Sequence, residues 1–127
     1  MNPETVIMRA LMVQANARGC LLMRNNSGAL PDRQGRLVRF GLGHESKETA
    51  GSSDLIGPWP VLIQPEHVGK TLGVMVCGEV KMPGPGEWEP RTETERRQVR
   101  WIAAMRAAGC LAGIIRTPSD LDNLLRL

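Results

Sequence analysis

The stretch LGVMVCGEVK, residues 72–81, decides how this chain is organised. It is rich in β-branched and apolar residues and lies between Gly69 and Pro83, which predicts a strand buried on both faces. Glu79 and Lys81 lie near its end, and side chains two residues apart leave a strand on the same face. Charged side chains are rarely buried unless they are paired or used in chemistry. Glu79 and Lys81 are therefore the first candidates for a functional site.

Length and composition are typical of one globular domain. The chain has 127 residues, 42% of them hydrophobic and 23% charged, with a net charge of +3. We therefore expect a single domain over residues 1–127, and the charge permits an anionic partner without requiring one. No apolar run approaches the roughly 20 residues of a membrane span, and no secretory signal is visible. Cys20, Cys77 and Cys110 lie in or beside apolar stretches, which indicates reduced, buried thiols rather than disulfides or a zinc site.

Periodicity and capping residues predict three helices with short strands between them. The first helix begins after Asn2, a typical N-cap, has Pro3 at its first position, and ends before Gly19. The other helices are expected from Thr92 or Thr94 to Gly109 and over residues 119–126. Strands are expected over residues 20–25, from Asp54 onward, and over 60–64, 72–81 and 111–116. This order predicts an α/β domain with a mixed central sheet flanked by helices.

Residues 29–50 are the part least typical of a compact domain. Glycines and arginines recur in this stretch, and Asp32-Arg33-Gln34-Gly35 predicts the turn of a protruding hairpin or arm. Loops of this length usually have a function. Arginines here and on the second long helix either bind DNA phosphates or form a solvated surface. The candidate DNA-binding residues are Arg24, Arg33, Arg36, Arg39, Arg97 and Arg100.

Asp54 adds a second carboxylate to the Glu79 and Lys81 pair if the two strands are neighbours. Two carboxylates and the backbone carbonyl of Val80 would form an all-oxygen site of the kind that Mg²⁺ or Mn²⁺ prefers. Lys81 would stabilise the charge of a phosphoryl transition state or orient the attacking water. The pattern predicts metal-assisted hydrolysis of phosphodiesters. Glu4 either presents its carboxylate to this site or interacts with the dipole of the first helix.

Three stretches together resemble a known family: GSSDLIG (residues 51–57), GVMVCGEVK (73–81), and the helix with Gln98 that ends in RAAGCLAG (106–113). They are similar to the VRR-NUC family, the virus-type replication–repair nucleases of the PD-(D/E)xK superfamily. The similarity covers essentially the whole chain, and the small stand-alone form resembles those encoded by bacteriophages. Ser53 stands where the superfamily motif has proline, a substitution that is tolerated in this family.

The resemblance implies a restriction-endonuclease-like fold and a Mg²⁺- or Mn²⁺-dependent endodeoxyribonuclease. It assigns Asp54 and Glu79 to the metal and Lys81 to catalysis, with Glu4 as a further acidic residue and Gln98 as a support for the site. The implied substrate is branched DNA such as a Holliday junction, in replication, recombination or repair.

The resemblance also implies a homodimer in the cytoplasm of a bacterial host, with the arm at residues 29–50 contacting DNA or the dimer partner. Two alternatives stay open. One is a non-catalytic module of the same fold that binds structured DNA, and the other is a metal-dependent hydrolase of small phosphoesters.

Overall fold

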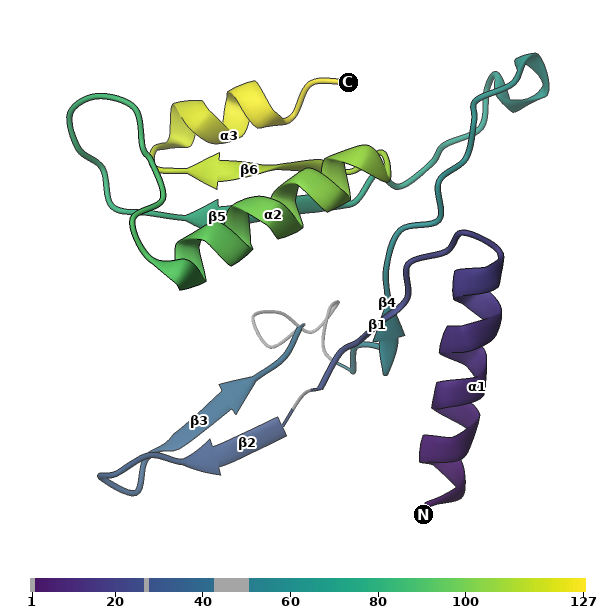
Figure 1. Ribbon diagram of the computed structural model, residues 1–127, viewed down its shortest axis with the longest axis horizontal. Coiled ribbons are helices and arrows are strands. Elements are labelled where there is room, and N and C mark those ends of the chain that lie inside the picture. Colours follow the sequence, from purple (N-terminus) through teal and green to yellow (C-terminus); the bar gives the residue numbers. More distant parts are fainter. Residues whose placement is uncertain (1, 27, 43–50) are drawn as a thin grey trace. The chain divides into compact units, whose positions relative to one another are not determined.

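The computed structural model describes residues 2–26, 28–42 and 51–127 (Figure 1). It divides into two units, Met1–Gly57 and Pro58–Leu127, and each is described by itself. Residues 43–50 of the expected arm lie outside the described residues. The single domain expected over residues 1–127 stays a prediction.

The described residues of the first unit form one helix and two antiparallel strand pairs. The helix begins at its N-cap Asn2, whose side chain accepts the Glu4 amide at 2.8 Å, and Gly19 follows it with a φ of 78°. Both predicted ends of this helix are therefore confirmed. The elements are α1 (Pro3–Ala17), β1 (Met23–Arg24) paired with β4 (Leu55–Ile56), and β2 (Gly28–Pro31) paired with β3 (Leu37–Phe40).

The turn between β2 and β3 confirms the predicted hairpin. The Asp32 carboxylate accepts the backbone amides of Gln34 and Arg36 at 2.9 and 2.8 Å, which closes the loop. Gly35 has a φ of 79°, a conformation in which glycine avoids the steric cost of a side chain. Short-range turn chemistry therefore determines the register of this hairpin.

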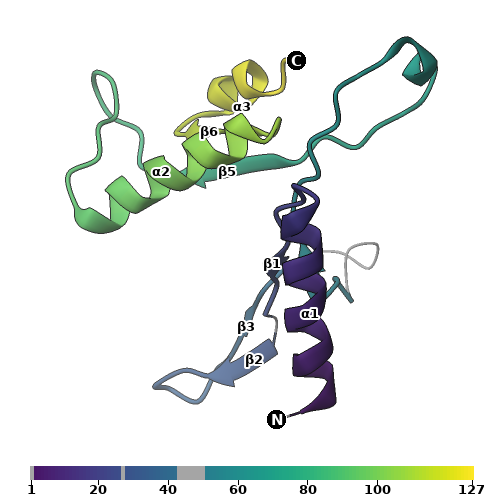
Figure 2. The same cartoon turned by 45° about the vertical axis from the view of Figure 1, so that its right-hand side comes forward.

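The second unit is a parallel strand pair with helices packed against it (Figure 2). The helix α2 follows β5 and leads into β6, a strand–helix–strand unit of the kind that parallel pairing requires. Its buried apolar core consists of Cys77, Ile102, Met105, Ala108, Cys110 and Ala112. Its elements are η1 (Pro65–His67), β5 (Val76–Val80), α2 (Glu93–Ala107), β6 (Leu111–Ile115) and α3 (Pro118–Leu124).

Three sequence expectations about strands were wrong in detail. The strand expected over residues 72–81 begins only at Val76, and of its five residues only Cys77 is buried, whereas Val80 is 74% exposed. Residues 60–64 form no strand in the described chain, since Pro58 and Pro60 lack the amide hydrogens that a ladder needs. The strand expected over residues 20–25 is confined to β1.

The α/β class is confirmed, but the described strands form three two-stranded sheets rather than one mixed central sheet. The first unit holds the antiparallel pairs and the second holds the parallel pair. Among the described helices, none has the length and apolar character needed to cross a membrane.

Candidate functional site

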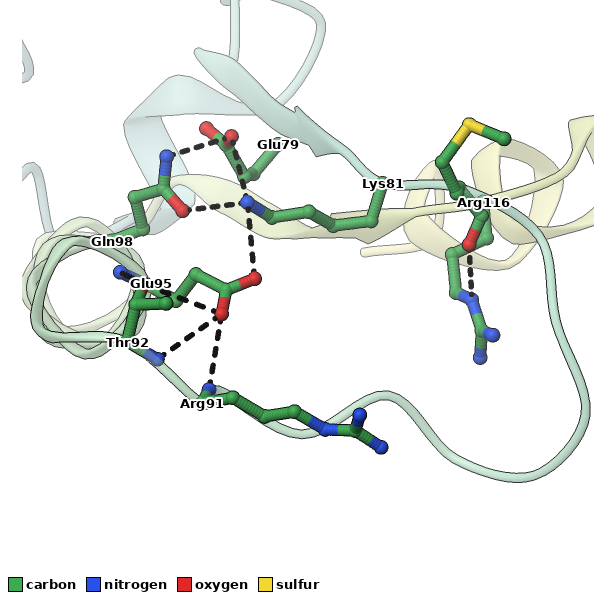
Figure 3. A network of polar contacts seen from close by, with 8 residues as sticks. Glu79, Lys81, Arg91, Thr92, Glu95, Gln98 and Arg116 are labelled. Atoms are coloured by element: carbon green, nitrogen blue, oxygen red, sulfur yellow. Dashed lines mark hydrogen bonds and ion pairs between the residues drawn. The ribbon is translucent and has the colours of Figure 1, made fainter.

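Glu79, Lys81 and Gln98 form a hydrogen-bonded group where β5 ends beside α2 (Figure 3). The ammonium Nζ of Lys81 donates to Gln98 Oε1 at 2.8 Å, and Gln98 Nε2 donates to Glu79 Oε1 at 2.9 Å. The direct distance between Lys81 Nζ and Glu79 Oε1 is 3.6 Å. The amide of Gln98 thus bridges two opposite charges, and the predicted placement of Glu79 and Lys81 on one face is confirmed.

Two further residues contact the ammonium of Lys81. A carboxylate oxygen of Glu95 lies 3.7 Å from Nζ, and the ring centroid of Trp88 lies 5.4 Å from it. This distance is within the range of a cation–π interaction. The Lys81 side chain is only 17% exposed, so its charge is held among two carboxylates, an amide and an indole. Neither Trp88 nor Glu95 was among the site residues predicted from the sequence.

Glu95 and Gln98 reach the site because of how α2 begins. Thr92 is the N-cap, and it forms a capping box with Glu95, whose carboxylate accepts the backbone amides of Arg91 and Thr92 at 3.0 and 3.2 Å. The hydrogen bond from the Arg91 amide, followed by that from Thr92 and the charge of Lys81, lowers the pKa of Glu95. Gln98 lies one turn further on, and residues three apart on a helix share a face. The Thr-x-x-Glu pattern in the sequence was a signal that could have identified Glu95.

An open hollow of about 310 Å³ adjoins the group and is lined by residues of both β5 and α2. Glu79 and Gln98 form its polar wall, and its remaining lining is mostly apolar, with Cys77, Trp101 and Ile102. Burial, with a smaller contribution from neighbouring Cys110, raises the pKa of the Cys77 thiol. This thiol is therefore a packing group rather than a nucleophile, as expected from the sequence.

The remaining predicted metal ligands belong partly to the other unit. Asp54 and Glu4 lie in the first unit, whereas Glu79 and Val80 lie in the second. Across the described residues, no group of three or more His, Cys, Asp or Glu side chains comes together as a metal site. The convergence of Asp54 and Glu4 with Glu79 stays a prediction.

The backbone at Asp54 is nevertheless well defined within the first unit. The Asn25 amide group donates to Ser52 Oγ at 2.9 Å and to the Ser53 carbonyl at 2.8 Å. The Asn25 backbone amide donates to the Asp54 carbonyl at 2.9 Å. Asn25, the last residue of the strand expected over residues 20–25, therefore holds the segment that carries the Asp54 carboxylate.

The predicted DNA-binding arginines fall into two groups. Arg24, Arg33 and Arg39 are exposed in the first unit, whereas the guanidinium of Arg36 is bound to the Asp32 carboxylate at 2.9 Å. On α2, the carboxylate of Glu93 forms ion pairs with three arginines, Arg96, Arg97 and Arg100, at 3.2, 3.7 and 2.9 Å. Three guanidinium groups against one carboxylate leave this helix surface positively charged.

Comparison with known proteins found no matching family model, no similar curated protein and no similar solved structure.

Proposed function

We propose that this protein is a Mg²⁺- or Mn²⁺-dependent endodeoxyribonuclease with a PD-(D/E)xK fold, selective for branched DNA. The observation that carries the proposal is the bridge from Lys81 through Gln98 to Glu79. The two charges form an ion pair at 3.6 Å, and the Gln98 amide is hydrogen-bonded to both of them, so each side chain is held by more than their mutual attraction. Such an arrangement fixes a carboxylate and an ammonium side by side, as phosphodiester hydrolysis requires.

Lys81 is suited to stabilise negative charge on a phosphate. Of its three N–H groups, one makes a short hydrogen bond to Gln98, whereas its contacts to Glu79 and Glu95, at 3.6 and 3.7 Å, are longer than hydrogen bonds. The ammonium therefore keeps donor capacity for a phosphate oxygen or an attacking water. Its restricted exposure strengthens this interaction because water competes less for the charge.

The donors that would hold the metal are all oxygen atoms, which fits Mg²⁺ or Mn²⁺. Asp54, Glu79 and the Val80 carbonyl would bind it, with Glu4 as a further carboxylate. When bound, the metal would polarise the scissile phosphate and lower the pKa of a coordinated water. Glu79 and Glu95 carry two negative charges and Lys81 carries one positive charge, so this group of three side chains has a net charge of −1. A net negative charge favours the binding of a cation.

The exposed arginines support DNA as the substrate. Arg97 and Arg100 lie on the helix that carries Gln98, and the hairpin carries Arg33 and Arg39. Contacts of this kind to phosphates position a duplex without reading its sequence, which suits recognition of DNA shape. A homodimer would place two such sites on the two strands of a junction, as the resemblance to the VRR-NUC family implies.

The decisive experiment is cleavage of a labelled four-way junction, a splayed duplex and a linear duplex in Mg²⁺, Mn²⁺ or EDTA. The proposal expects metal-dependent cutting, with a preference for a branched substrate, that is lost in Lys81→Ala. Arg91→Ala is the matched control, because that side chain points away from the network in Figure 3. Tight binding of the junction without cutting in any metal would favour the non-catalytic module, and neither binding nor cutting would favour small phosphoesters.

Calorimetric titration with Mn²⁺ tests the ligands separately from activity. Asp54→Asn and Glu79→Gln each remove a charged oxygen ligand and should each weaken Mn²⁺ binding. Undiminished affinity in both variants would refute the proposed metal site, even if cleavage were observed.

A further inference from the structure

We propose that Arg116 is a positioning residue for Lys81, acting through the loop of residues 82–90. The inference rests on the proposed function, in which Lys81 is the catalytic lysine. Arg116 is not among the described residues that contact the Lys81 side chain, and its own guanidinium bonds go to the loop. Its effect would be to hold the loop that brings Trp88 over the ammonium.

Arg116 ties this loop to the end of β6. Its guanidinium donates from Nε to the Met82 carbonyl at 3.1 Å and from Nη1 to the Gly86 carbonyl at 2.9 Å. The third nitrogen, Nη2, lies against Gly84, where an added Cβ would approach it to 3.0 Å. One planar fork therefore spans the first half of the loop, which a single-point donor such as lysine could not do.

Arg116 is itself held in place by its neighbours. Its backbone amide donates to the Asp120 carboxylate at 2.8 Å, and the same carboxylate closes the capping box of α3 with Thr117. The preceding residue, Ile115, accepts the Lys81 backbone amide at 3.0 Å. The Lys81 main chain is thus hydrogen-bonded to the residue that precedes Arg116, where the two parallel strands end.

The loop leads from Lys81 to the residue that covers its side chain. It leaves β5 at Met82, contains Gly86 with a φ of 71°, and carries Trp88 to within 5.4 Å of the ammonium. Prolines at 83, 85 and 90 restrict the φ angles of the loop, and the two carbonyls that Arg116 binds anchor its first half. Loss of the hydrogen bonds from Arg116 to the loop would therefore let Trp88 move away from the Lys81 ammonium, whose side chain would then have more conformational freedom.

Proton NMR of the lysine side chains is a direct test, because the chain has only three lysines, Lys47, Lys70 and Lys81. The ring current of Trp88 should set the Lys81 Hε resonances apart from those of the other two. In Arg116→Gln we expect the Lys81 resonances to move toward those of Lys70. Arg116→Lys, which keeps the charge and most of the side-chain stem, should show a smaller change of the same sign. Arg91→Gln is the matched control and should leave the Lys81 resonances unchanged.

Kinetics provide the second readout on the same variants. Arg116→Gln should lower kcat by about tenfold to a hundredfold, the size expected when a catalytic group is slightly misplaced, with little change in KM. Unchanged Lys81 resonances in folded Arg116→Gln, or an equal shift in Arg91→Gln, would overturn the inference. The NMR result stands even if the wild-type protein cuts no DNA, an outcome that would count against the proposed function alone.

Discussion

Replacement of Gln98 by methionine should destabilise the second unit by about 2 kcal/mol, because Gln98 supplies hydrogen bonds to both charges of the site. Methionine is a good substitute for this purpose, since it has a similar length, suits a helix and has no hydrogen-bond donor. The variant therefore removes the bridge between Lys81 and Glu79 and keeps the helix.

The expected magnitude follows from the geometry. A hydrogen bond to a charged group contributes about 1.5–3 kcal/mol, and partial exposure of both charges argues for the lower end, about 3 kcal/mol for the two bonds. Lys81 and Glu79 are 3.6 Å apart, so they can close into a direct pair that returns up to about 1 kcal/mol. The remaining loss of about 2 kcal/mol corresponds to a change of roughly 30-fold in the unfolding equilibrium.

Urea unfolding followed by tryptophan fluorescence is a suitable assay. All three tryptophans of the chain, Trp59, Trp88 and Trp101, lie in the unit that contains the site, so the signal reports on that unit. Arg97→Met is the control, because it makes a similar change on the same helix at a side chain that is 74% exposed. Its effect should lie within about 0.5 kcal/mol.

A double-mutant cycle with Lys81→Met separates the bridge from general effects of the substitution. If the bond between Gln98 and Lys81 is as described, the two changes should be coupled by about 1 kcal/mol or more. Two results would refute the proposed role of the Gln98 bridge in holding Lys81 and Glu79 together. One is a coupling energy near zero, and the other is a loss of unfolding free energy in Gln98→Met that is no larger than in Arg97→Met.

Three other predictions concern pH, thiol reactivity and close packing. Because the pKa of Glu95 is lowered in the folded chain, its carboxylate stabilises the fold above its ordinary value of 4.5 and loses this effect as the pH falls through the lowered pKa. The difference in unfolding free energy between wild type and Glu95→Gln should therefore shrink between pH 6 and about pH 3, and a constant difference would contradict it. Burial raises the pKa of Cys77, so Cys20, which is only half-buried, should react first with a thiol reagent, as mass spectrometry of the labelled peptides would show. Gly57→Ala would press a methyl group against the Leu21 carbonyl and should lower the unfolding free energy by about 1–3 kcal/mol in urea titrations followed by circular dichroism, whereas an unchanged midpoint would rule out this close approach.

The sequence by itself determined the local features of this protein. The N-caps at Asn2, Thr92 and Thr117, the glycine after α1 and the turn at Asp32 were all predictable, because each depends on residues within four positions of one another. The common face of Glu79 and Lys81 follows in the same way from the period of a strand.

Only the tertiary structure decided which side chains surround Lys81. Trp88 and Glu95 are 7 and 14 positions away from it along the chain, and they reach its ammonium because a tied loop and a capping box place them there. The burial of β5 could not be predicted from the local sequence either. An apolar run predicts a buried strand, but Val76 and Val80 are exposed because burial depends on which surfaces of the strand other elements cover. Sequence period fixes the direction in which a side chain points, whereas its partners depend on contacts between residues distant in the chain.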